Sequence, residues 1–325
     1  MSKLSKFSEH INTMLKEKAR EQVLSVLFID GEDTRAREAA LYLKNNNLAK
    51  PIMLLENASQ VVNDGLENII MTEQEAKINE YATKLVEIRK GKEDLATCLN
   101  NLHTRPYFGA MMIRTKDIDA AVGGLIYSTA DILRAAFKCI GAKPGIKTIS
   151  SIIVMHKDDE KLIFTDPSTV QKPNAEQLVD IAANAIDFAK TMNMNDLAGF
   201  LTYSTNNSGQ GENPDLVREA VKLATEKGLN IVHGEMQFDS AYDLNVRKHK
   251  FPQAVQKELG VYVFPNLESC NIGCKIAQRL GGYGAVGAIM QGVNGAINDF
   301  SRGAKVQDVI DVTSITILKA YEFLK

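Results

Sequence analysis

The chain has 325 residues, of which 45% are hydrophobic and 24% are charged, and its formal net charge at pH 7 is −2. This length and composition are typical of a globular protein with two domains. The near-neutral charge disfavours binding to nucleic acid or to an anionic membrane, and no run approaches the roughly 18 apolar residues of a membrane-spanning helix.

The first 22 residues have an amphipathic pattern. Apolar Leu4, Phe7, Ile11 and Leu15 recur at helical spacing, which predicts a helix packed by one face. The apolar core of a secretory signal is missing from this stretch, so we expect a cytoplasmic protein.

The cysteines agree with this location. The chain has four, and they form no dense framework of the kind that disulfides staple. Cys270 and Cys274 stand four residues apart, but no neighbouring histidine completes a metal site. We therefore expect them to pack at the start of a helix, and we expect no metal site.

Apolar runs then alternate with helical patterns. Strands are predicted at 23–29, 51–55 and 120–126, and helices at 35–43, 73–90 and around 105–112. After a Gly- and Pro-containing boundary at 141–147, further strands are predicted at 148–155, 162–164, 197–205, 230–235, 261–265 and 285–290, with helices at 175–191, 214–226 and 272–280. This alternation predicts α/β domains with mainly parallel sheets between helices.

The segment 298–308 carries the most suggestive chemistry. It brings Ser301, Arg302 and Asp308 together just before an apolar-periodic helix. A hydroxyl, a fork-shaped cation and a carboxylate suit a transfer between a phosphate and a thiol. The pattern alone fits a structural role as well: Asp308 can complement the helix dipole, and Arg302 can form an ion pair.

The segment 123–134 reads as a strand followed by a capped helix. Ser128 can cap that helix, and Asp131 stands three residues later, as in a capping box. The start of such a helix attracts anions, and Arg134 lies about two turns further on. A purely structural cap explains the same pattern, and the pattern taken alone favours this interpretation.

Two further segments are candidates for a binding site. Arg89 lies in a small basic cluster at a predicted helix end, where it can bind an anion or complement the helix dipole. The polar segment 202–217 follows a predicted strand, at the sheet edge where α/β proteins bind ligands.

The sequence NDFSRG at 298–303, followed by Asp308, closely resembles the signature of phosphotransacetylases (phosphate acetyltransferases). The resemblance also includes GEDTR at 31–35, RPYFGAMM at 105–112 and FTDPSTVQKPNAEQL at 164–178, so it spans nearly the whole chain. It implies reversible transfer of an acetyl group between acetyl phosphate and coenzyme A, by direct thiolate attack in a ternary complex. Coenzyme A is then a substrate, and no tightly bound cofactor is implied.

The resemblance also implies roles for individual residues. The family carboxylate that matches Asp308 is the general base towards the thiol. The hydroxyl that matches Ser301 hydrogen-bonds at the reacting centre, and the arginine that matches Arg302 binds phosphate and stabilises developing charge. The positions that match the family's substrate-binding residues are Arg89, Arg134, Ser128 and Thr129.

The family fold implies two three-layer α/β/α domains with the active site in the cleft between them. Residues 1–144 and 291–325 would form the first domain, because the C-terminal segment returns to it, and residues 145–290 the second. The resemblance further implies a homodimer.

The chain departs from the family pattern at a few positions. Ala135 follows Arg134 where proline is usual, Gly295-Ala296 replaces Lys-Pro, and the segment 264–271 reads FPNLESCN. These changes leave Ser301, Arg302 and Asp308 in place and bear on the acyl chain. A phosphate butyryl- or propionyltransferase is therefore an alternative. A metal-dependent hydroxy-acid dehydrogenase of related fold, or a silent binding module, is more distant.

Overall fold

The structure is a computed structural model that describes residues 4–324. The chain divides into two compact units. One, here called the terminal unit, comprises Ser8–Pro144 and Val293–Lys325, and the other, the central unit, comprises Gly145–Gly292 with the residues up to Phe7. No helix among residues 4–324 is both long and apolar enough to cross a bilayer.

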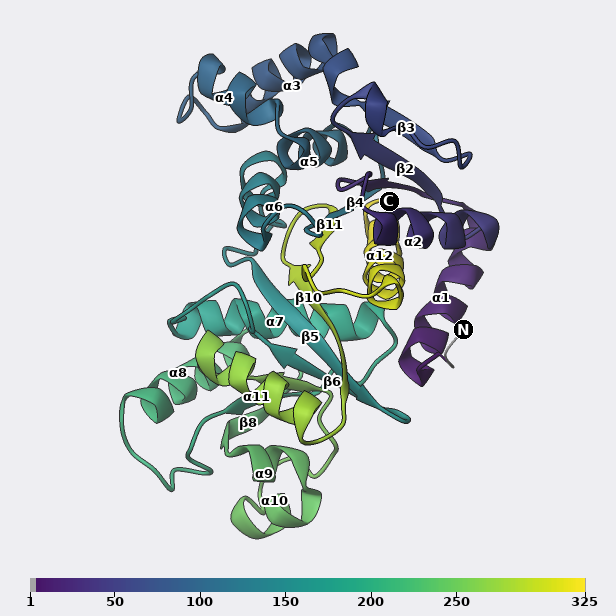
Figure 1. Ribbon diagram of the computed structural model, residues 1–325. Helices are drawn as coiled ribbons and strands as arrows, with labels where there is room; N and C mark the ends of the chain where they lie inside the picture. The colour runs from purple at the N-terminus through teal and green to yellow at the C-terminus, as the bar shows by residue number, and fades with distance from the viewer. Residues whose placement is uncertain (1–3, 325) are drawn as a thin grey trace. The chain divides into compact units, whose positions relative to one another are not determined.

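The terminal unit contains a five-stranded sheet in the order β11-β4-β1-β2-β3. Figure 1 labels β2, β3, β4 and β11 of this sheet. Every neighbouring pair in it is parallel. The strands are β1 (Ser25–Phe28), β2 (Lys50–Leu55), β3 (Glu67–Ile70), β4 (Ala120–Gly123) and β11 (Ala296–Asp299). The chain leaves β1 towards β2 on one side, whereas β4 and β11 lie on the other, so the strand order reverses between β1 and β4.

Helices lie on both faces of this sheet because successive strand residues point to opposite sides. Gly109 of α5 approaches Leu27 and Ile29, so these two side chains face α5, and α2 and α12 pack on the opposite face. The helices are α1 (Lys6–Glu21), α2 (Thr34–Asn45), α3 (Glu75–Ile88), α4 (Leu95–Leu102), α5 (Arg105–Thr115), α6 (Thr129–Ala135) and α12 (Val306–Ala320), with short turns η1 (Ala58–Gln60), η2 (Met71–Glu73), η3 (Ala136–Ile140) and η4 (Tyr321–Phe323).

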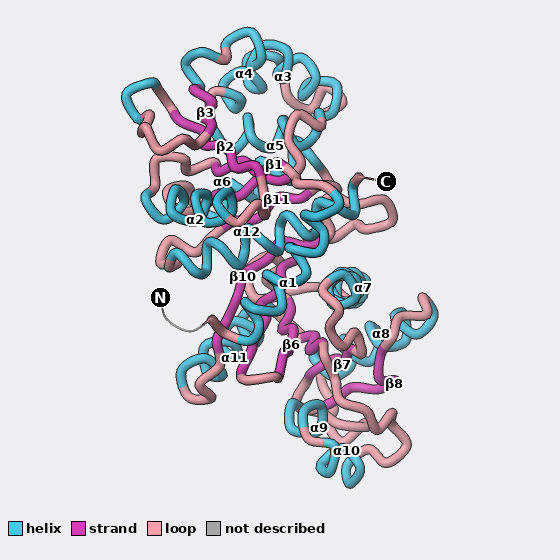
Figure 2. The backbone as a smooth tube through the Cα atoms, turned by 90° about the vertical axis from the view of Figure 1, so that its right-hand side faces the viewer, coloured by secondary structure: helices cyan, strands magenta, loops and turns pink. Residues whose placement is uncertain are grey.

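The central unit has a six-stranded mixed sheet in the order β10-β5-β6-β9-β7-β8. Its pairs are parallel except β5 with β6 and β10 with β5, which are antiparallel. The strands are β5 (Ser150–Lys157), β6 (Glu160–Thr165), β7 (Ala198–Leu201), β8 (Ile231–Met236), β9 (Val261–Val263) and β10 (Gly284–Gln291). Figure 2 shows α7 (Ala175–Thr191) and α8 (Glu212–Glu226) on one side of these strands and α11 (Leu267–Arg279) on the other.

The α11 face of this sheet holds an aromatic core that includes Phe164 and Tyr262. Cys270 and Cys274 are free thiols buried in that core, so the predicted packing at a helix start is present. The helix begins at Leu267, earlier than predicted, because the Asn266 side chain caps it by accepting the Ser269 N–H at 2.9 Å. Two short helices, α9 (Phe238–Tyr242) and α10 (Leu244–Lys250), complete the unit.

A buried carboxylate joins α12 to α1 within the terminal unit. Asp311 Oδ2 accepts from Ser8 Oγ at 2.7 Å, and Asp311 Oδ1 accepts from Gln307 Nε2 at 2.9 Å. Burial raises the pKa of Asp311 to about 6, the charge of Asp308 adds to this rise, and the two hydrogen bonds oppose it. Folding therefore favours the protonated carboxyl, and this contribution is complete below the unfolded pKa near 3.8 and lost as pH rises through about 6.

We therefore expect Asp311→Asn to unfold at a higher urea concentration than the wild type at pH 8. A shift of about two pKa units corresponds to about 2–3 kcal/mol of unfolding free energy, so the gain should shrink towards zero below pH 5. Glu17→Gln, which neutralises an exposed acid on α1, is the control and should show no such pH dependence. Equal midpoints of wild type and Asp311→Asn at pH 8 would contradict this assignment.

Candidate active site

The carboxyl ends of the five parallel strands meet at one edge of the terminal unit's sheet. In open α/β sheets, ligands bind at this edge where the strand order reverses. Here that reversal lies between β1 and β4. Ser128 and Thr129 follow β4, and Ser301 and Arg302 follow β11, so four predicted site residues leave the sheet from the same edge.

The loop from β11 to α12 is held through its backbone carbonyls, which leaves the side chains of Ser301 and Arg302 exposed. Arg35 Nη1 donates to Arg302 O at 2.8 Å and to Ala304 O at 2.9 Å. Asp33 accepts from Arg35 Nε at 3.0 Å and Nη2 at 2.8 Å, so the guanidinium is fixed on both sides. Ser301 and Arg302 are exposed, and the Arg302 guanidinium contacts no partner among residues 4–324.

Asp308 lies in the first turn of α12 and is half-buried. Its Oδ2 accepts the Lys305 N–H at 2.8 Å, which satisfies one of the free donors at the helix start. Within the described part of the chain its Oδ1 makes no hydrogen bond. The structural role expected of an acid here is therefore present, and one carboxylate oxygen stays available.

The predicted capping box at α6 is present. Ser128 Oγ accepts the Asp131 N–H at 3.2 Å, and Asp131 Oδ2 accepts from Ser128 N at 3.2 Å and from Ser128 Oγ at 2.6 Å. The hydrogen bond from Ser128 lowers the pKa of Asp131. Arg134 Nη1 lies 3.3 Å from Asp131 Oδ1, and its side chain is 54% exposed.

The β4–α6 turn and the β11–α12 loop are joined directly. Thr129 Oγ1 donates to Asp299 Oδ2 at 2.6 Å, and Phe300 N donates to Gly123 O at 2.7 Å. Gly124 has φ +106, and a Cβ there would lie 2.8 Å from Phe300 O, so only glycine permits this approach. Burial raises the pKa of Asp299 to about 6, against the opposing effect of the Thr129 hydrogen bond.

A buried arginine fixes the neighbouring loops at the same edge. Arg105 of α5 is bound by both carboxylate oxygens of Glu32, which follows β1. It also donates to Leu54 O at the end of β2 at 3.1 Å and to Tyr127 Oη in the β4–α6 turn at 3.2 Å. One planar guanidinium thus ties together the ends of three strands.

Arg89 lies apart from these contacts. It ends α3, and its Nε lies 3.6 Å from Glu93 Oε1. Glu93 also binds Lys138 Nζ of η3 at 2.6 Å, so Arg89 and Lys138 share one carboxylate. Among residues 4–324, no contact joins Arg89 to Ser301, Arg302 or Asp308, so a substrate-binding role for Arg89 stays a prediction.

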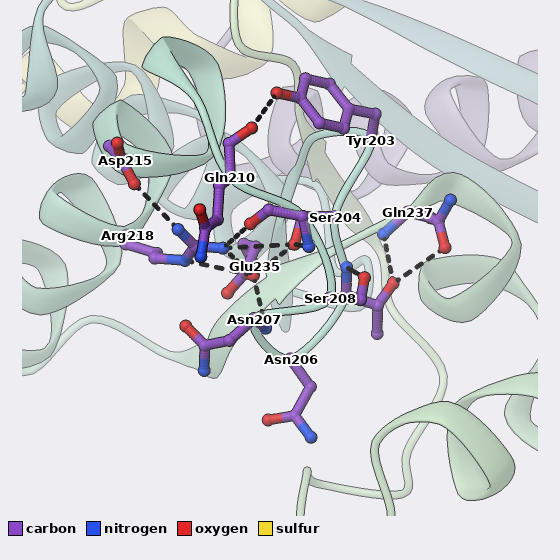
Figure 3. Close-up of polar contacts among 12 residues, drawn as sticks. Tyr203, Ser204, Asn206, Asn207, Ser208, Gln210, Asp215, Arg218, Glu235 and Gln237 are labelled. Carbon is purple, nitrogen blue, oxygen red and sulfur yellow. Dashed lines mark hydrogen bonds and ion pairs between the residues drawn. The ribbon is translucent and has the colours of Figure 1, made fainter.

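The central unit fixes its polar loop, the predicted candidate at 202–217, around one buried acid. Glu235 of β8 accepts from Ser204 Oγ and from Asn207 N, both at 2.8 Å, and from Arg218 Nη2 at 3.1 Å. Figure 3 shows these groups converging on its carboxylate. Burial opposes the charge, but the hydrogen bonds outweigh it, and the pKa of Glu235 is lowered. The loop therefore has one defined shape.

The sequence model of the family described as phosphate acetyl/butaryl transferase matches residues 10–317. The chain belongs to this family. A phosphate acetyltransferase of Mycoplasma capricolum subsp. capricolum is 37% identical over 322 residues, covering 96% of this chain and 99% of the relative. One from Staphylococcus aureus is 36% identical over 326 residues, covering 95% and 98%. These relatives are acyltransferases.

Solved structures of family members have the same fold. A phosphotransacetylase from Streptococcus pyogenes aligns with a TM-score of 0.90 at 34% identity, covering 97% of this chain and 99% of the other. One from Staphylococcus aureus aligns with a TM-score of 0.87 at 35% identity over the same shares. A branched-chain phosphotransacylase from Enterococcus faecalis has a TM-score of 0.69 at 13% identity, covering 91% and 99%, which shows the fold alone.

The sequence patterns alone indicate no individual role for Arg35, Arg105 or Asp299. Each lies inside a segment that carries the family resemblance: GEDTR, RPYFGAMM and NDFSRG. The resemblance of each whole motif to the family could therefore have drawn attention to these three residues. Their contacts are with backbone carbonyls and with residues far away in sequence, which spacing along the chain does not reveal.

We expect Arg35→Ala to loosen the β11–α12 loop. Hydrogen–deuterium exchange of the Ala304 amide, which donates to Ser301 O at 2.9 Å, should rise about tenfold or more. A hydrogen bond to a charged donor contributes about 1.5–3 kcal/mol, and about 1.4 kcal/mol is tenfold.

Arg37→Ala is the matched control, because Arg37 lies on the same helix but binds Gly31 O and Asp64 instead. It should leave the exchange at Ala304 unchanged. Unchanged exchange in Arg35→Ala would show that other contacts hold the loop.

Proposed function

We propose that the protein is a phosphate acetyltransferase, which interconverts acetyl-CoA plus phosphate with acetyl phosphate plus coenzyme A. One observation carries the proposal. The β11–α12 loop presents the Ser301 hydroxyl and the unpaired Arg302 guanidinium beside the helix start that holds Asp308. The names of relatives 36–37% identical over nearly the full length support the same reaction.

Asp308 acts as the general base in this proposal. A free thiol has a pKa of about 8.5 and attacks only as the thiolate, so a base that removes its proton makes coenzyme A reactive at neutral pH. Asp308 keeps one oxygen free of hydrogen bonds to residues 4–324, and its other oxygen is fixed by the Lys305 N–H.

Ser301 and Arg302 stabilise the negative charge that develops during the transfer. Thiolate attack on the acyl carbonyl builds an oxyanion, and the departing phosphate carries negative charge. A guanidinium binds a phosphate through two parallel hydrogen bonds, which suits an exposed Arg302 without a protein partner among the described residues. Ser301 supplies a hydroxyl next to it. Positioning of both substrates supplies the rest of the rate without a covalent intermediate.

The remaining predicted residues serve substrate binding in this proposal. Ser128 and Thr129 start α6 at the same sheet edge, and Arg134 keeps a half-exposed guanidinium near them. Arg89, shared with Glu93, would contribute to coenzyme A binding from the end of α3. The proposed reaction needs no tightly bound cofactor, since coenzyme A, acetyl phosphate and phosphate are its substrates. The terminal and central units would serve as the two predicted domains.

Purified protein given coenzyme A and acetyl phosphate should form the thioester, with a chelator present, and acetyl phosphate should be used better than propionyl or butyryl phosphate. Thioester absorbance measures this directly. Faster transfer from butyryl phosphate would instead support the phosphate butyryltransferase alternative. Absence of thioester with every short acyl phosphate would reject the reaction.

Asp308→Asn should lower kcat by about 10²–10⁴-fold with little change in KM for coenzyme A, because the amide cannot accept a proton. Above about pH 8.5 the solution supplies thiolate, so the variant should partly recover. Asp243→Asn is the control, since Asp243 caps α10 by accepting the Asn245 N–H at 2.7 Å. It should keep wild-type kcat, and a wild-type kcat in Asp308→Asn would exclude Asp308 as the base.

We further propose a homodimer formed through α11. Ile272, Ile276 and Leu280 are 52%, 53% and 85% exposed and lie at the four-residue spacing of one helical face. Glu268 is in the first turn of this helix and Arg279 in the last. An antiparallel second copy would cover the apolar side chains and place each Glu268 opposite the partner's Arg279, as a two-fold interface requires.

Ile276→Glu should therefore yield a monomer by analytical ultracentrifugation, since two carboxylates would be buried near the two-fold axis. Val61→Glu, at another exposed apolar residue that is 44% exposed, should stay dimeric. A monomeric wild type, or a dimeric Ile276→Glu, would contradict this interface.

We also propose a cytoplasmic location, which the four buried free thiols support.

A further inference from the structure

Both hydroxyls of the Ser128–Thr129 pair donate to carboxylates of the protein. Ser128 Oγ donates to Asp131 Oδ2, and Thr129 Oγ1 donates to Asp299 Oδ2, each at 2.6 Å. A hydroxyl has a single proton, so while these bonds persist neither can donate to a bound phosphate. Thr129 can therefore contribute to a binding site only indirectly, through the hydrogen bond that positions the start of α6.

Asp299 is an unusual partner for a hydroxyl. It is the last residue of β11, its side chain is nearly inaccessible, and Thr129 is the one side chain among residues 4–324 that hydrogen-bonds with it. Burying a carboxylate without a cation costs free energy, and a neutral residue would pack there at lower cost. The neighbouring Asn298 donates to Thr316 on α12 at 2.8 Å.

The turn is held from its other side as well. Asp30, which follows β1, accepts the Leu125 N–H at 2.7 Å, and its Oδ1 is buried without a partner. β1 and β11 are the two neighbours of β4 in the sheet. The turn that leaves β4 is therefore bracketed by a buried carboxylate from each neighbouring strand, one holding the backbone and one holding a side chain.

We infer that Asp299 is a positioning residue for the acyl transfer: through the Thr129 hydroxyl it fixes the start of α6 against the loop that carries Ser301 and Arg302. Ser301 and Arg302 lie two and three residues beyond Asp299, so one side chain sets the place of both phosphate-binding segments. The group positioned is the phosphoryl group of the acyl phosphate, and of free phosphate in the reverse direction. This inference rests on the proposed function.

The test is the KM for acetyl phosphate in variants of the pair. Thr129→Val removes the hydroxyl at nearly constant shape, and Asp299→Ala removes the acceptor, so each should raise this KM about tenfold. The KM for coenzyme A should stay within about twofold. Thr129→Ser and Asp299→Asn retain a donor and an acceptor and should restore most of the affinity. The double variant should raise the KM for acetyl phosphate no more than either single variant does, because both substitutions remove the same interaction.

Ser25→Ala and Asp119→Ala are the matched controls. Ser25 Oγ donates to Asp119 Oδ2 at 2.6 Å, the same bond at the opposite edge of the same sheet. These variants should lower the thermal midpoint and leave the KM for acetyl phosphate unchanged.

Additive effects of Thr129→Val and Asp299→Ala, or a wild-type KM in Thr129→Val, would overturn the inference while an active wild type upholds the proposed function. A wild type that forms no thioester would overturn both. If Asp299→Ala fails to fold, Thr129→Val against Thr129→Ser still decides.

Discussion

The parallel pairing of β11 with β4 is the interaction on which the candidate site depends. It aligns Ala296–Asp299 with Ala120–Gly123, two segments separated by the whole central unit. Because parallel strands end at the same edge, this register alone brings the loop of Ser301 and Arg302 beside the turn of Ser128 and Thr129. The entropic cost of closing so long a loop grows only slowly with its length, so a large insertion is tolerated at this point.

Around that edge, charged side chains hold the loops in place by hydrogen bonds to backbone groups. Arg35 holds the carbonyls of the β11–α12 loop, Arg105 holds the end of β2, and Asp30 holds an N–H of the β4–α6 turn. Charge-assisted hydrogen bonds are stronger than neutral ones and direct the chain without occupying the exposed side chains. The outcome is a rigid frame whose free groups, Ser301 and Arg302, face solvent.

Much of the fold could be predicted from periodicity and caps. The helix predicted at 175–191 coincides with α7 because Asn174 and Gln177 form a capping box at its start. The strand β11 was not predicted, since its four residues end in polar Asn298 and Asp299, which are buried against residues far away in sequence. The antiparallel β5–β6 pair was also not evident, because strand periodicity does not specify direction.

The candidate site was predictable to a different degree. Ser301 and Arg302 were predicted from the contiguous motif NDFSRG and Asp308 from its place five residues after it, and the capping box at Ser128 followed from spacing alone. The Thr129–Asp299 hydrogen bond joins residues 170 positions apart and needs the β4–β11 register, which local patterns do not encode. Motifs thus give the chemical groups, whereas the contacts that orient them come from tertiary packing.

The discontinuous terminal unit also has a consequence for biosynthesis. The central unit is almost contiguous in the chain and can fold as soon as Gly292 has left the ribosome. The sheet of the terminal unit must wait for β11, and its α2 face stays uncovered until α12 is made. The nascent chain therefore carries a half-built sheet with an open edge at β4 while the central unit is translated. An unpaired strand edge is a template for pairing with another chain, so we expect β4 to be open to such pairing until β11 is made.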